Sequence, residues 1–528
     1  MRLARLALAV LLASCPLVAC AQSAPVRPGS ENPPPAILRE MRGVWVATVG
    51  NMDWPSRRGL SSAQQQGELL AILDRMVALH MNAMVLQVRP AADALYASTL
   101  EPWAEVLTGE MGRPPAPYYD PLAFAVTEAH QRGIELHVWI NPYRAQDPST
   151  PRVSADHVSH TQPGLVRRYG SFLWLDPGDP AVRALTTSVV LDLVRRYDID
   201  AVHMDDYFYP YKETRHGREL DFPDASAYAR YRRAGGRLTR DDWRRDNVNR
   251  LVESLGGEIH RLKPWVRFGI SPFGIWRPGH PASVQGLDQY RELYADARKW
   301  IAEGWVDYLA PQLYWPVGRP HQSYVALLHW WAEQNVKGRN LYAGNYTGKV
   351  AFHNGQKFSV DEILTQIRLT RAEPGASGNV HFSSSVFMQD PDRLDERLAA
   401  EAYAEPALVP ASPWLHPAPP PAPVATLRTD AATGARVVDL RSGVTGAAMA
   451  STTMSTTAPP WQWVVQLERS GGWSTSILPG AARAFVVAAR GAEAPRAVWV
   501  TAIDRVGNAS RPSRAGPTPP TSVTPGRP

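Results

Sequence analysis

Between residues 41 and 403 the chain alternates short apolar runs with longer segments in which apolar residues recur at helical spacing. The short runs are rich in β-branched and aromatic residues, which is typical of strands. Strands are predicted over 43–49, 83–89, 135–141, 201–205, 266–272, 308–314, 341–346 and 380–386. Helices are predicted over 61–80, 121–132, 180–197, 247–263, 290–303, 324–335, 361–370 and 391–403.

This repeated order of strand and helix predicts an α/β fold, a (β/α)₈ barrel of the TIM type over residues 39–408. A doubly wound open sheet is the alternative. That fold carries a glycine-rich turn after its first strand, and the segment from Asn51 to Ser56 is not one. Residues 211–247 are charged and aromatic without a core pattern, so we expect this insertion to cover the functional face.

A proline-rich stretch over 409–424 predicts a stiff linker after the barrel. Over 425–514, short runs alternate apolar and polar residues between turn-rich pieces, which predicts a small β-sandwich. Its last part, 498–512, resembles a fibronectin type III-like module. Residues 515–528 are rich in Pro, Thr and Ser and predict a disordered tail.

The first 19 residues have a basic start and a short apolar core, the pattern of an export signal. The apolar core, 6–12, is too short to span a membrane. Residues 17–20, Leu-Val-Ala-Cys, resemble a bacterial lipobox, which implies cleavage before Cys20 and acylation of its thiol. A simple secretory signal cut near Ala21 is the alternative.

Residues 20–38, rich in Pro and Ser, are predicted to be a flexible tether. Ala21 after the cysteine resembles the sorting pattern of outer-membrane lipoproteins. We therefore expect a periplasmic protein held to the outer membrane by a lipid on Cys20. Cys15 and Cys20 are the only cysteines, so no internal disulfide is expected.

Composition adds two points. The net charge of +6 is mild and no basic run is concentrated, so we expect no nucleic-acid partner. The 18 Trp residues favour contact with carbohydrate, because amphipathic rings are suited to such surfaces.

The fourth predicted strand ends in two adjacent acids, Asp205 and Asp206. Function in a (β/α)₈ barrel sits at the carboxyl ends of the strands, and paired acids cleave glycosidic bonds. The alternative is that one Asp caps a loop and the other is solvated. Strand alternation places His203 on the inward face with Asp205, either as its orienting neighbour or as a satisfied core histidine.

Amides, cations and rings occupy the ends of the other predicted strands. The candidate substrate-binding residues are Arg89, Trp139, Asn141, Tyr143, His203, Tyr207, Trp276, Gln312, Tyr314, Trp315 and Asn345. Adjacent acids on one strand rarely straddle a sugar, and a conventional mechanism needs a second carboxylate across the bond. That possible partner is Asp53, Glu105 or Asp390, or an acid of the insertion such as Asp221.

Other chemistries fit the sequence poorly. It has no Gly-x-Ser-x-Gly elbow, no phosphate-binding loop and no His-Glu-x-x-His motif. His203 and Asp205 would contribute to a metal site in a polysaccharide deacetylase, but no second pair of histidines stands at other strand ends. We therefore expect no metal and no cofactor.

Seven long motifs together resemble the glycosyl hydrolase-like 10 family, also called domain of unknown function 187. They begin at Met41 (MRGVWVATV), Asp53 (DWPS), Gln87 (QVRP), Trp139 (WINPYR), His203 (HMDDYFYP), Phe268 (FGISPFGIWR) and Asp307 (DYLAPQLYW). The resemblance spans about residues 42–386 and implies a (β/α)₈ glycoside hydrolase. Its lipoprotein members imply cleavage of denuded peptidoglycan, the MurNAc–GlcNAc strand stripped of peptides.

Two versions of the mechanism stay open. Either one of these candidate carboxylates faces the Asp pair, or the acetamido group of the substrate is the nucleophile. In the second version one Asp orients the acetamide and the next protonates the leaving oxygen, and the Asp-Asp pair resembles that of O-GlcNAc hydrolases. The rival function is a non-catalytic glycan-binding lipoprotein, whose C-terminal sandwich would be a possible contact for a protein partner.

Overall fold

The computed structural model describes residues 33–150, 152–352, 357–443 and 459–517. The expected signal peptide, Cys20 and most of the tether lie outside these residues, as do residues 518–528 of the expected tail.

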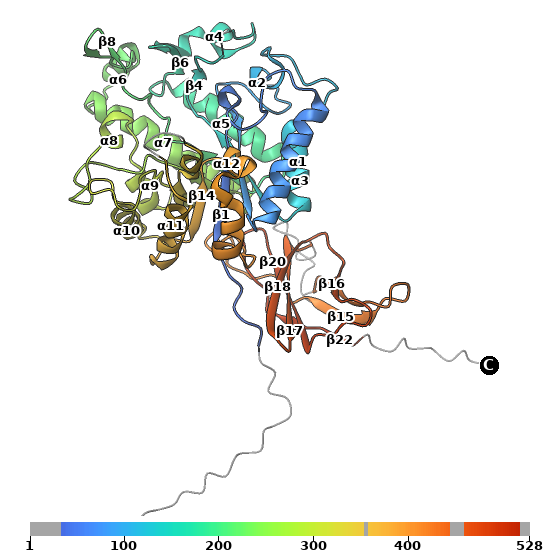
Figure 1. The fold of residues 1–528 in the computed structure, drawn as a ribbon. Coiled ribbons are helices and arrows are strands. Elements are labelled where there is room, and N and C mark those ends of the chain that lie inside the picture. The colour runs from blue at the N-terminus through green and yellow to red at the C-terminus, as the bar shows by residue number, and fades with distance from the viewer. Residues whose placement is uncertain (1–32, 151, 353–356, 444–458, 518–528) are drawn as a thin grey trace, which may run out of the picture.

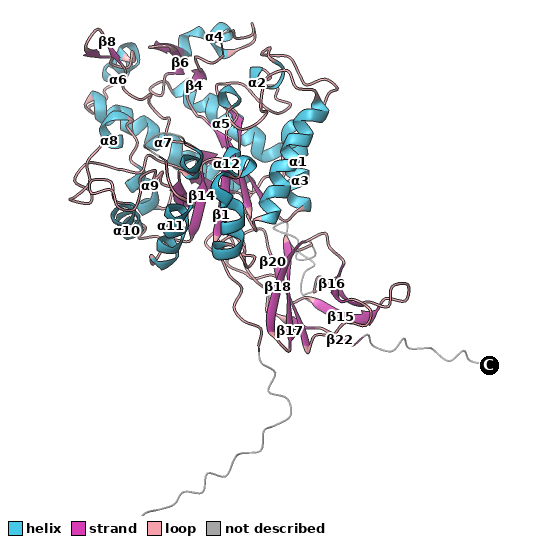
Figure 2. Cartoon of the chain, in the orientation of Figure 1, coloured by secondary structure: helices cyan, strands magenta, loops and turns pink. Residues whose placement is uncertain are grey.

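Parallel strands form the centre of the molecule (Figures 1 and 2). They are β1 (Met41–Val46), β2 (Ala83–Arg89), β3 (Glu135–Ile140), β7 (Ala201–Met204), β10 (Arg267–Ile270), β11 (Tyr308–Leu309), β12 (Asn340–Leu341), β13 (Ala343–Asn345) and β14 (Gly378–His381). Their order is β12-β11-β10-β7-β3-β2-β1-β14-β13. Since only Tyr342 separates β12 from β13, the two ends of the sheet belong to one strand and the sheet closes. The (β/α)₈ prediction is confirmed, and the open sheet is wrong.

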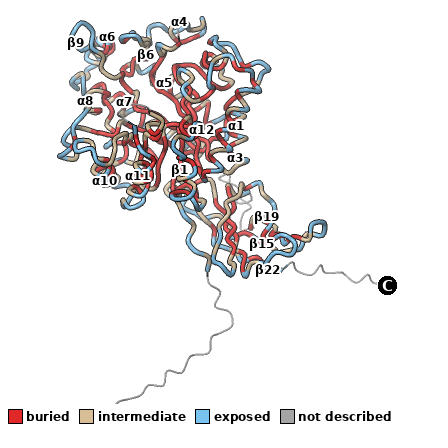
Figure 3. Tube along the Cα trace, in the orientation of Figure 1, coloured by how far each residue is buried: buried red, intermediate tan, exposed pale blue. Residues whose placement is uncertain are grey.

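Helices surround the barrel and bury one face each. They are α1 (Ser62–Ala78), α3 (Pro121–Gln131), α5 (Pro180–Arg196), α7 (Arg240–Leu262), α9 (Ala297–Glu303), α10 (Tyr324–Gln334), α11 (Val360–Ala372) and α13 (Leu394–Arg397), which continues as a wider turn over Leu398–Ala402. Most of these helices are preceded by an N-cap residue whose side chain accepts a hydrogen bond from a backbone N–H of the first turn. These residues are Ser61, Asp120, Asp179, Thr239, Ser323 and Ser359. Figure 3 shows the buried segments gathered around the strands.

Several predicted boundaries are wrong. The sixth strand covers only Tyr308–Leu309, and the fourth helix begins at Arg240. The eighth strand ends at His381, and Ser384–Gln389 form α12, because Ser383 and Ser385 turn inward to bind Asp53. The predicted helix over 290–303 is broken into α8 (Gln289–Glu292) and α9. A left-handed backbone at Tyr294 (φ 53°) separates the two pieces.

Loops at the carboxyl ends of the strands carry small elements of their own. After β3 the chain forms a sheet of β4 (Arg144–Gln146), β5 (Val166–Tyr169) and β6 (Phe172–Leu175), which the sequence pattern did not predict. The insertion after β7 folds into the hairpin β8 (Thr214–Arg215) and β9 (Arg218–Glu219), then α6 (Ala225–Arg233) and the first turns of α7. Shorter helices are α2 (Glu105–Thr108) and α4 (Val158–Thr161). No helix within the described ranges is long and apolar enough to cross a membrane.

The C-terminal module packs two four-stranded sheets face to face. One is β19 (Ala484–Ala488), β16 (Arg436–Arg441), β15 (Val424–Thr429) and β22 (Gly516–Pro517); the other is β18 (Gly472–Pro479), β17 (Gln462–Arg469), β20 (Ala497–Ile503) and β21 (Ser513–Arg514). Val438, Trp463 and Val500 lie in the core between the sheets. A sandwich is therefore present, whereas its fibronectin type III-like character stays a prediction.

This module lies against the amino ends of the barrel strands (Figure 1). Arg505 pairs with Asp198 and with Asp200 at 3.0 Å, just before β7. The stretch predicted to be a linker also packs on this end: Arg267 Nε donates to Ser412 Oγ at 3.1 Å, and Trp414 Nε1 donates to Asp307 at 2.7 Å. The carboxyl ends of the strands stay clear of the module.

Candidate active site

A cavity of about 270 Å³ opens at the carboxyl ends of the barrel strands. Its walls are Trp45, Ala47, Val49, Met52, Gln87, Trp139, Arg144, Asp205, Asp206, Tyr207, Tyr211, Ser271, Gln312, Tyr314, Tyr346 and Phe382. Asp205 and Asp206 are the two acids among them, and aromatic rings form much of the rest. Of the sequence-predicted residues, the cavity brings together the Asp pair with Trp139, Tyr207, Gln312 and Tyr314.

Asp205 is held in place by donors from two neighbouring segments. Trp139 Nε1 donates to Oδ2 at 3.0 Å, Asn141 Nδ2 donates to Oδ1 at 3.1 Å, and the backbone N–H of Tyr207 donates to Oδ1 at 3.1 Å. Burial raises the pKa of Asp205, and the Arg144 guanidinium together with these donors opposes the rise. The carboxylate is therefore fixed in orientation, and its donors and Arg144 partly offset the effect of burial on its pKa.

Asp206 has a different environment one residue later. Its Oδ2 accepts a hydrogen bond from the Tyr211 hydroxyl, and Gln312 is a second hydrogen-bonding neighbour. Burial, together with the adjacent charge of Asp205, raises the pKa of Asp206 to about 6. Burial raises the pKa of both acids, but the charge of Asp205 adds to the rise at Asp206 whereas the Arg144 guanidinium opposes it at Asp205. Asp206 is therefore the better placed of the two to donate a proton.

His203 lies beneath the cavity floor and does not line it. Trp45 Nε1 donates to His203 Nε2 at 3.1 Å, so the ring proton sits on Nδ1 and points at the Tyr308 hydroxyl, 3.0 Å away. Burial lowers the pKa of His203 well below its usual value. The neutral ring supports Trp45 and Ser271, which do form the floor. Of the two alternatives for His203, the structure therefore shows a buried core histidine whose ring nitrogens are hydrogen-bonded, and not a residue that orients Asp205.

Arg89, Tyr143 and Asn345 are buried away from the cavity. Arg89 Nε donates to both oxygens of Glu101, at 3.0 and 2.8 Å, and Arg89 Nη1 donates to the backbone of Asn141. Tyr143 is fully buried in the layer between barrel and helices. Asn345 Nδ2 donates to Gln366 at 2.7 Å. These side chains hold the loops that carry the site.

Two predicted tryptophans lie elsewhere on this face. Trp276 Nε1 donates to Asp296 at 3.1 Å, and its ring stacks on Trp330 with centroids 5.6 Å apart, so it does not reach the acids' cavity. Trp315 lines a neighbouring cavity.

The three candidate partner carboxylates also lie outside the cavity walls. Asp53 accepts from the backbone N–H of Ala47 at 2.7 Å and from Ser383 and Ser385 at 2.7 and 3.2 Å. Glu105 is buried with its Oε2 3.1 Å from Arg58 Nε. Asp390 is exposed and accepts from the backbone of Asp395. The structure brings none of the three to the Asp pair, and Asp221 is paired with Arg244 at 2.9 Å outside the cavity walls.

Sequence reasoning overlooked Trp45, Tyr211 and Phe382, which all line the cavity. Trp45 could have been found, since it lies on the predicted strand 43–49 and alternation places it on the same face as Ala47, which also lines the cavity. Tyr211 follows the Asp pair in an aromatic run, but only the fold of the insertion returns its hydroxyl to Asp206. In the part of the chain that the structure describes, no three His, Cys, Asp or Glu side chains gather so as to hold a metal ion.

A closed (β/α)₈ barrel with two unlike acids in a ring-lined cavity at its carboxyl end is the architecture of a glycoside hydrolase. The chain belongs to the glycosyl hydrolase-like 10 family, whose model matches residues 40–360. It is therefore a glycoside hydrolase with a polysaccharide substrate, and the non-catalytic alternative is set aside.

Two relatives of this chain are named glycosyl hydrolases. Glycosyl hydrolase YngK of Bacillus subtilis (strain 168) is 42% identical over 404 residues, which cover 74% of this chain and 77% of the relative. Glycosyl hydrolase DigH of Escherichia coli (strain K12) is 36% identical over 416 residues, which cover 71% and 90%. The glycoside hydrolase domain of PgaB (BpsB) from Bordetella bronchiseptica aligns at 13% identity with a TM-score of 0.44, covering 69% and 99%, a likeness too loose to add to the argument.

Proposed function

We propose that this glycoside hydrolase cleaves the glycan of bacterial peptidoglycan in its peptide-free form, and that the acetamido group of the substrate is the nucleophile. The proposal is carried by one observation. Among the described residues, Asp205 and Asp206 are the acids on the cavity wall, and they are adjacent residues at the end of one strand. A conventional pair must flank the bond from two sides, about 5 Å apart or more. The missing partner is then supplied by the sugar.

The two acids have different roles in the proposed mechanism. Asp206, with its raised pKa, gives its proton to the glycosidic oxygen as the bond from that oxygen to C1 breaks. The carbonyl oxygen of the 2-acetamido group attacks C1 and forms a cyclic oxazolinium ion. Asp205 accepts the hydrogen bond from the acetamide N–H and stabilises the positive charge that develops there. Water then opens the ring while Asp206 takes up its proton, so the configuration at C1 is retained.

The remaining walls suit an amino-sugar ring. Trp139, Tyr207 and Tyr314 offer flat faces to the apolar side of the sugar, and Gln87 and Gln312 offer amides to its hydroxyls. The rigid mounting of Trp139 on β3 keeps Asp205 aligned, because the same indole lines the cavity and donates to the carboxylate. An uncharged, acetylated sugar is therefore the group that we place beside the acids.

The test compares the wild type with Asp205→Asn and Asp206→Asn on denuded peptidoglycan strands before and after chemical N-deacetylation. We expect the wild type to release sugars only from acetylated strands, and each substitution to lower kcat about 10²- to 10⁴-fold. Equal cleavage of both strands would remove the acetamide from the mechanism. Full activity in both variants would remove the Asp pair from the site.

We also propose that the enzyme works at the periplasmic face of the outer membrane, tethered by a lipid on Cys20. The support is the lipobox-like segment before that residue. Labelling cells with a palmitate analogue tests it: the wild type should carry the label and fractionate with outer membranes. Cys20→Ser should lose both properties, and a labelled Cys20→Ser protein would contradict the proposal.

A further inference from the structure

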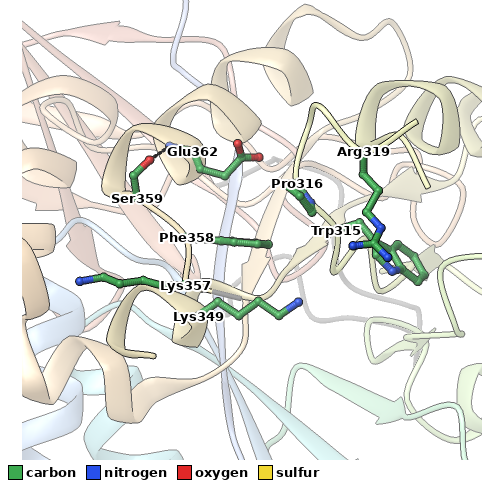
Figure 4. A pocket seen from close by; sticks show the side chains of 8 residues that line it. All are labelled: Trp315, Pro316, Arg319, Lys349, Lys357, Phe358, Ser359 and Glu362. Carbon is green, nitrogen blue, oxygen red and sulfur yellow. Dashed lines mark hydrogen bonds between the residues drawn. The ribbon is translucent and has the colours of Figure 1, made fainter. Parts of the chain in front are cut away.

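A second cavity, of about 540 Å³, adjoins the catalytic one on the same face of the barrel. Figure 4 shows its walls, which are Trp315, Pro316, Arg319, Lys349, Lys357, Phe358, Ser359 and Glu362. They come from the segment after β11, from the segment after β13 and from the start of α11. The site described above does not use this cavity.

The two cavities share a wall. Lys349 Nζ donates to the backbone oxygen of Tyr314 at 2.9 Å and lies 5.0 Å from the centre of the Tyr346 ring. Both tyrosines line the cavity that holds Asp205 and Asp206. A glycan chain that extends from the acids toward β11 and β13 would therefore pass one tyrosine of this shared wall and then contact Lys349.

Two cations on the second cavity have no acid to balance them. Within the described ranges, neither Arg319 nor Lys349 forms an ion pair; Arg319 Nε donates to Gln322 at 2.7 Å. Figure 4 shows the Lys349 amine directed toward the side of Arg319, while Lys357 extends the opposite way. Lys357 is already paired with Asp392 at 2.8 Å.

Glu362 is the one acid on the described wall, and its Oε1 is occupied. It accepts from the backbone N–H of Val317 at 2.7 Å and from Gln366 at 2.9 Å. Burial and the nearby Arg319 lower the pKa of Lys349, as they do for a cation without an anion. A ligand carboxylate would favour the charged form of Lys349, and the ring of Trp315 would contact the sugar that carries it. The Phe358 ring lies against Lys349 itself, with the amine 4.9 Å from the ring centre.

We propose that this second cavity is a subsite for a carboxylate-bearing sugar, which Lys349 and Arg319 bind next to the acetylated sugar at the acids. The inference rests on the proposed function, because the lactyl ether of one sugar in each peptidoglycan disaccharide supplies such a carboxylate. A neutral amino-sugar strand leaves both cations unpaired. The subsite therefore makes the enzyme favour acidic glycans over neutral ones of the same backbone.

The test uses the full-length enzyme and three strands of equal length: denuded peptidoglycan, the same strand with its carboxyl groups reduced to alcohols, and a GlcNAc-only strand. Lys349→Met and Arg319→Gln remove the cations. Lys337→Met is the charge-matched control, an exposed lysine before β12 at the opposite end of the barrel. Each cavity variant should lose about three- to tenfold in kcat/KM on the acidic strand and little on the other two. Lys337→Met should behave as the wild type.

Equal losses on all three strands would mean that the cations only support the fold, and unchanged kinetics on the acidic strand would remove the subsite. Either result leaves the proposed function intact. If the wild type cleaves none of the strands, the proposed function falls. Calorimetric titration of Asp206→Asn with the acidic and the reduced strand then tests the subsite by binding alone. Tighter binding of the acidic strand, together with loss of that preference in the double variant Asp206→Asn/Lys349→Met, would support the subsite. Equal binding of the two strands would overturn it.

Discussion

The indole Nε1 of Trp139 donates to Oδ2 of Asp205 at 3.0 Å, while the face of the same indole forms part of the cavity wall. One side chain thus orients the carboxylate and contacts the space in which we propose that the sugar binds. A donor to a carboxylate favours its ionised form and lowers its pKa.

Trp139→Phe keeps a ring but removes this donor. We expect the pKa of Asp205 to rise, so the acid limb of the kcat/KM–pH profile moves to higher pH, and kcat falls about tenfold or more. The measurement is the pH profile on denuded strands. Trp473→Phe, the same change in β18 of the C-terminal module, is the control. An unmoved acid limb in Trp139→Phe would show that Asp205 does not have to be ionised.

Tyr211 is expected to influence the alkaline limb of the same pH profile, through the pKa of Asp206. In the proposed mechanism Asp206 acts in its protonated form, and its pKa of about 6 predicts that kcat/KM declines as the pH rises above about 6. The Tyr211 hydroxyl donates to the carboxylate and lowers that pKa. Tyr211→Phe should therefore move the declining limb to higher pH. A limb that moves to lower pH, or one that stays in place while kcat falls, would assign Tyr211 another role.

Asp206 also makes the stability of the fold depend on pH. Its pKa rises from about 3.9 in the unfolded chain to about 6 in the fold, so the unfolded chain releases the proton first. The folded state loses stability as the pH rises from about 4 to about 6, by up to about 3 kcal/mol. Asp206→Asn should unfold at a higher temperature than the wild type at pH 7, with no difference at pH 3.5. Scanning calorimetry at the two pH values measures this, and a lower Tm at pH 7 would contradict it.

Asp53 is expected to matter for stability more than for chemistry. It joins the loop after β1 to the start of α12 through two hydrogen bonds, and it accepts a third from Ala47 within that loop. Asp53→Asn places an amide where two of those donors point and should cost about 1–3 kcal/mol. Activity per folded molecule at low temperature should stay within about tenfold of the wild type, with Asp390→Asn as the exposed control. A 10²-fold loss in Asp53→Asn at unchanged Tm would restore Asp53 as a catalytic partner.

Most of the barrel was predictable because its strands are buried on both faces and read as apolar runs. The prediction was weakest at the rim. Ser383 and Ser385 extended the apparent eighth strand in sequence, yet they leave the sheet to bind Asp53, 330 residues earlier in the chain for Ser383. Such a contact carries no local signal. The small sheet of β4, β5 and β6 was missed for the same reason, since its short strands pair with each other over a loop.

The sequence by itself determined the order of strands and helices, the adjacent acids at the end of β7 and the family, because periodicity and contiguous motifs are local properties of a chain. Only the tertiary structure decided which polar residues face the substrate. Arg89 and Arg144 both follow strand ends, but Arg89 is neutralised by Glu101 whereas Arg144 lies on the cavity wall and supports Asp205. The two acids likewise differ through Trp139, Asn141 and Tyr211, which the closing of the barrel and the folding of the insertion bring to them from 66, 64 and 5 residues away. Burial and partner choice depend on the packed surroundings, and those exist only once the barrel is closed.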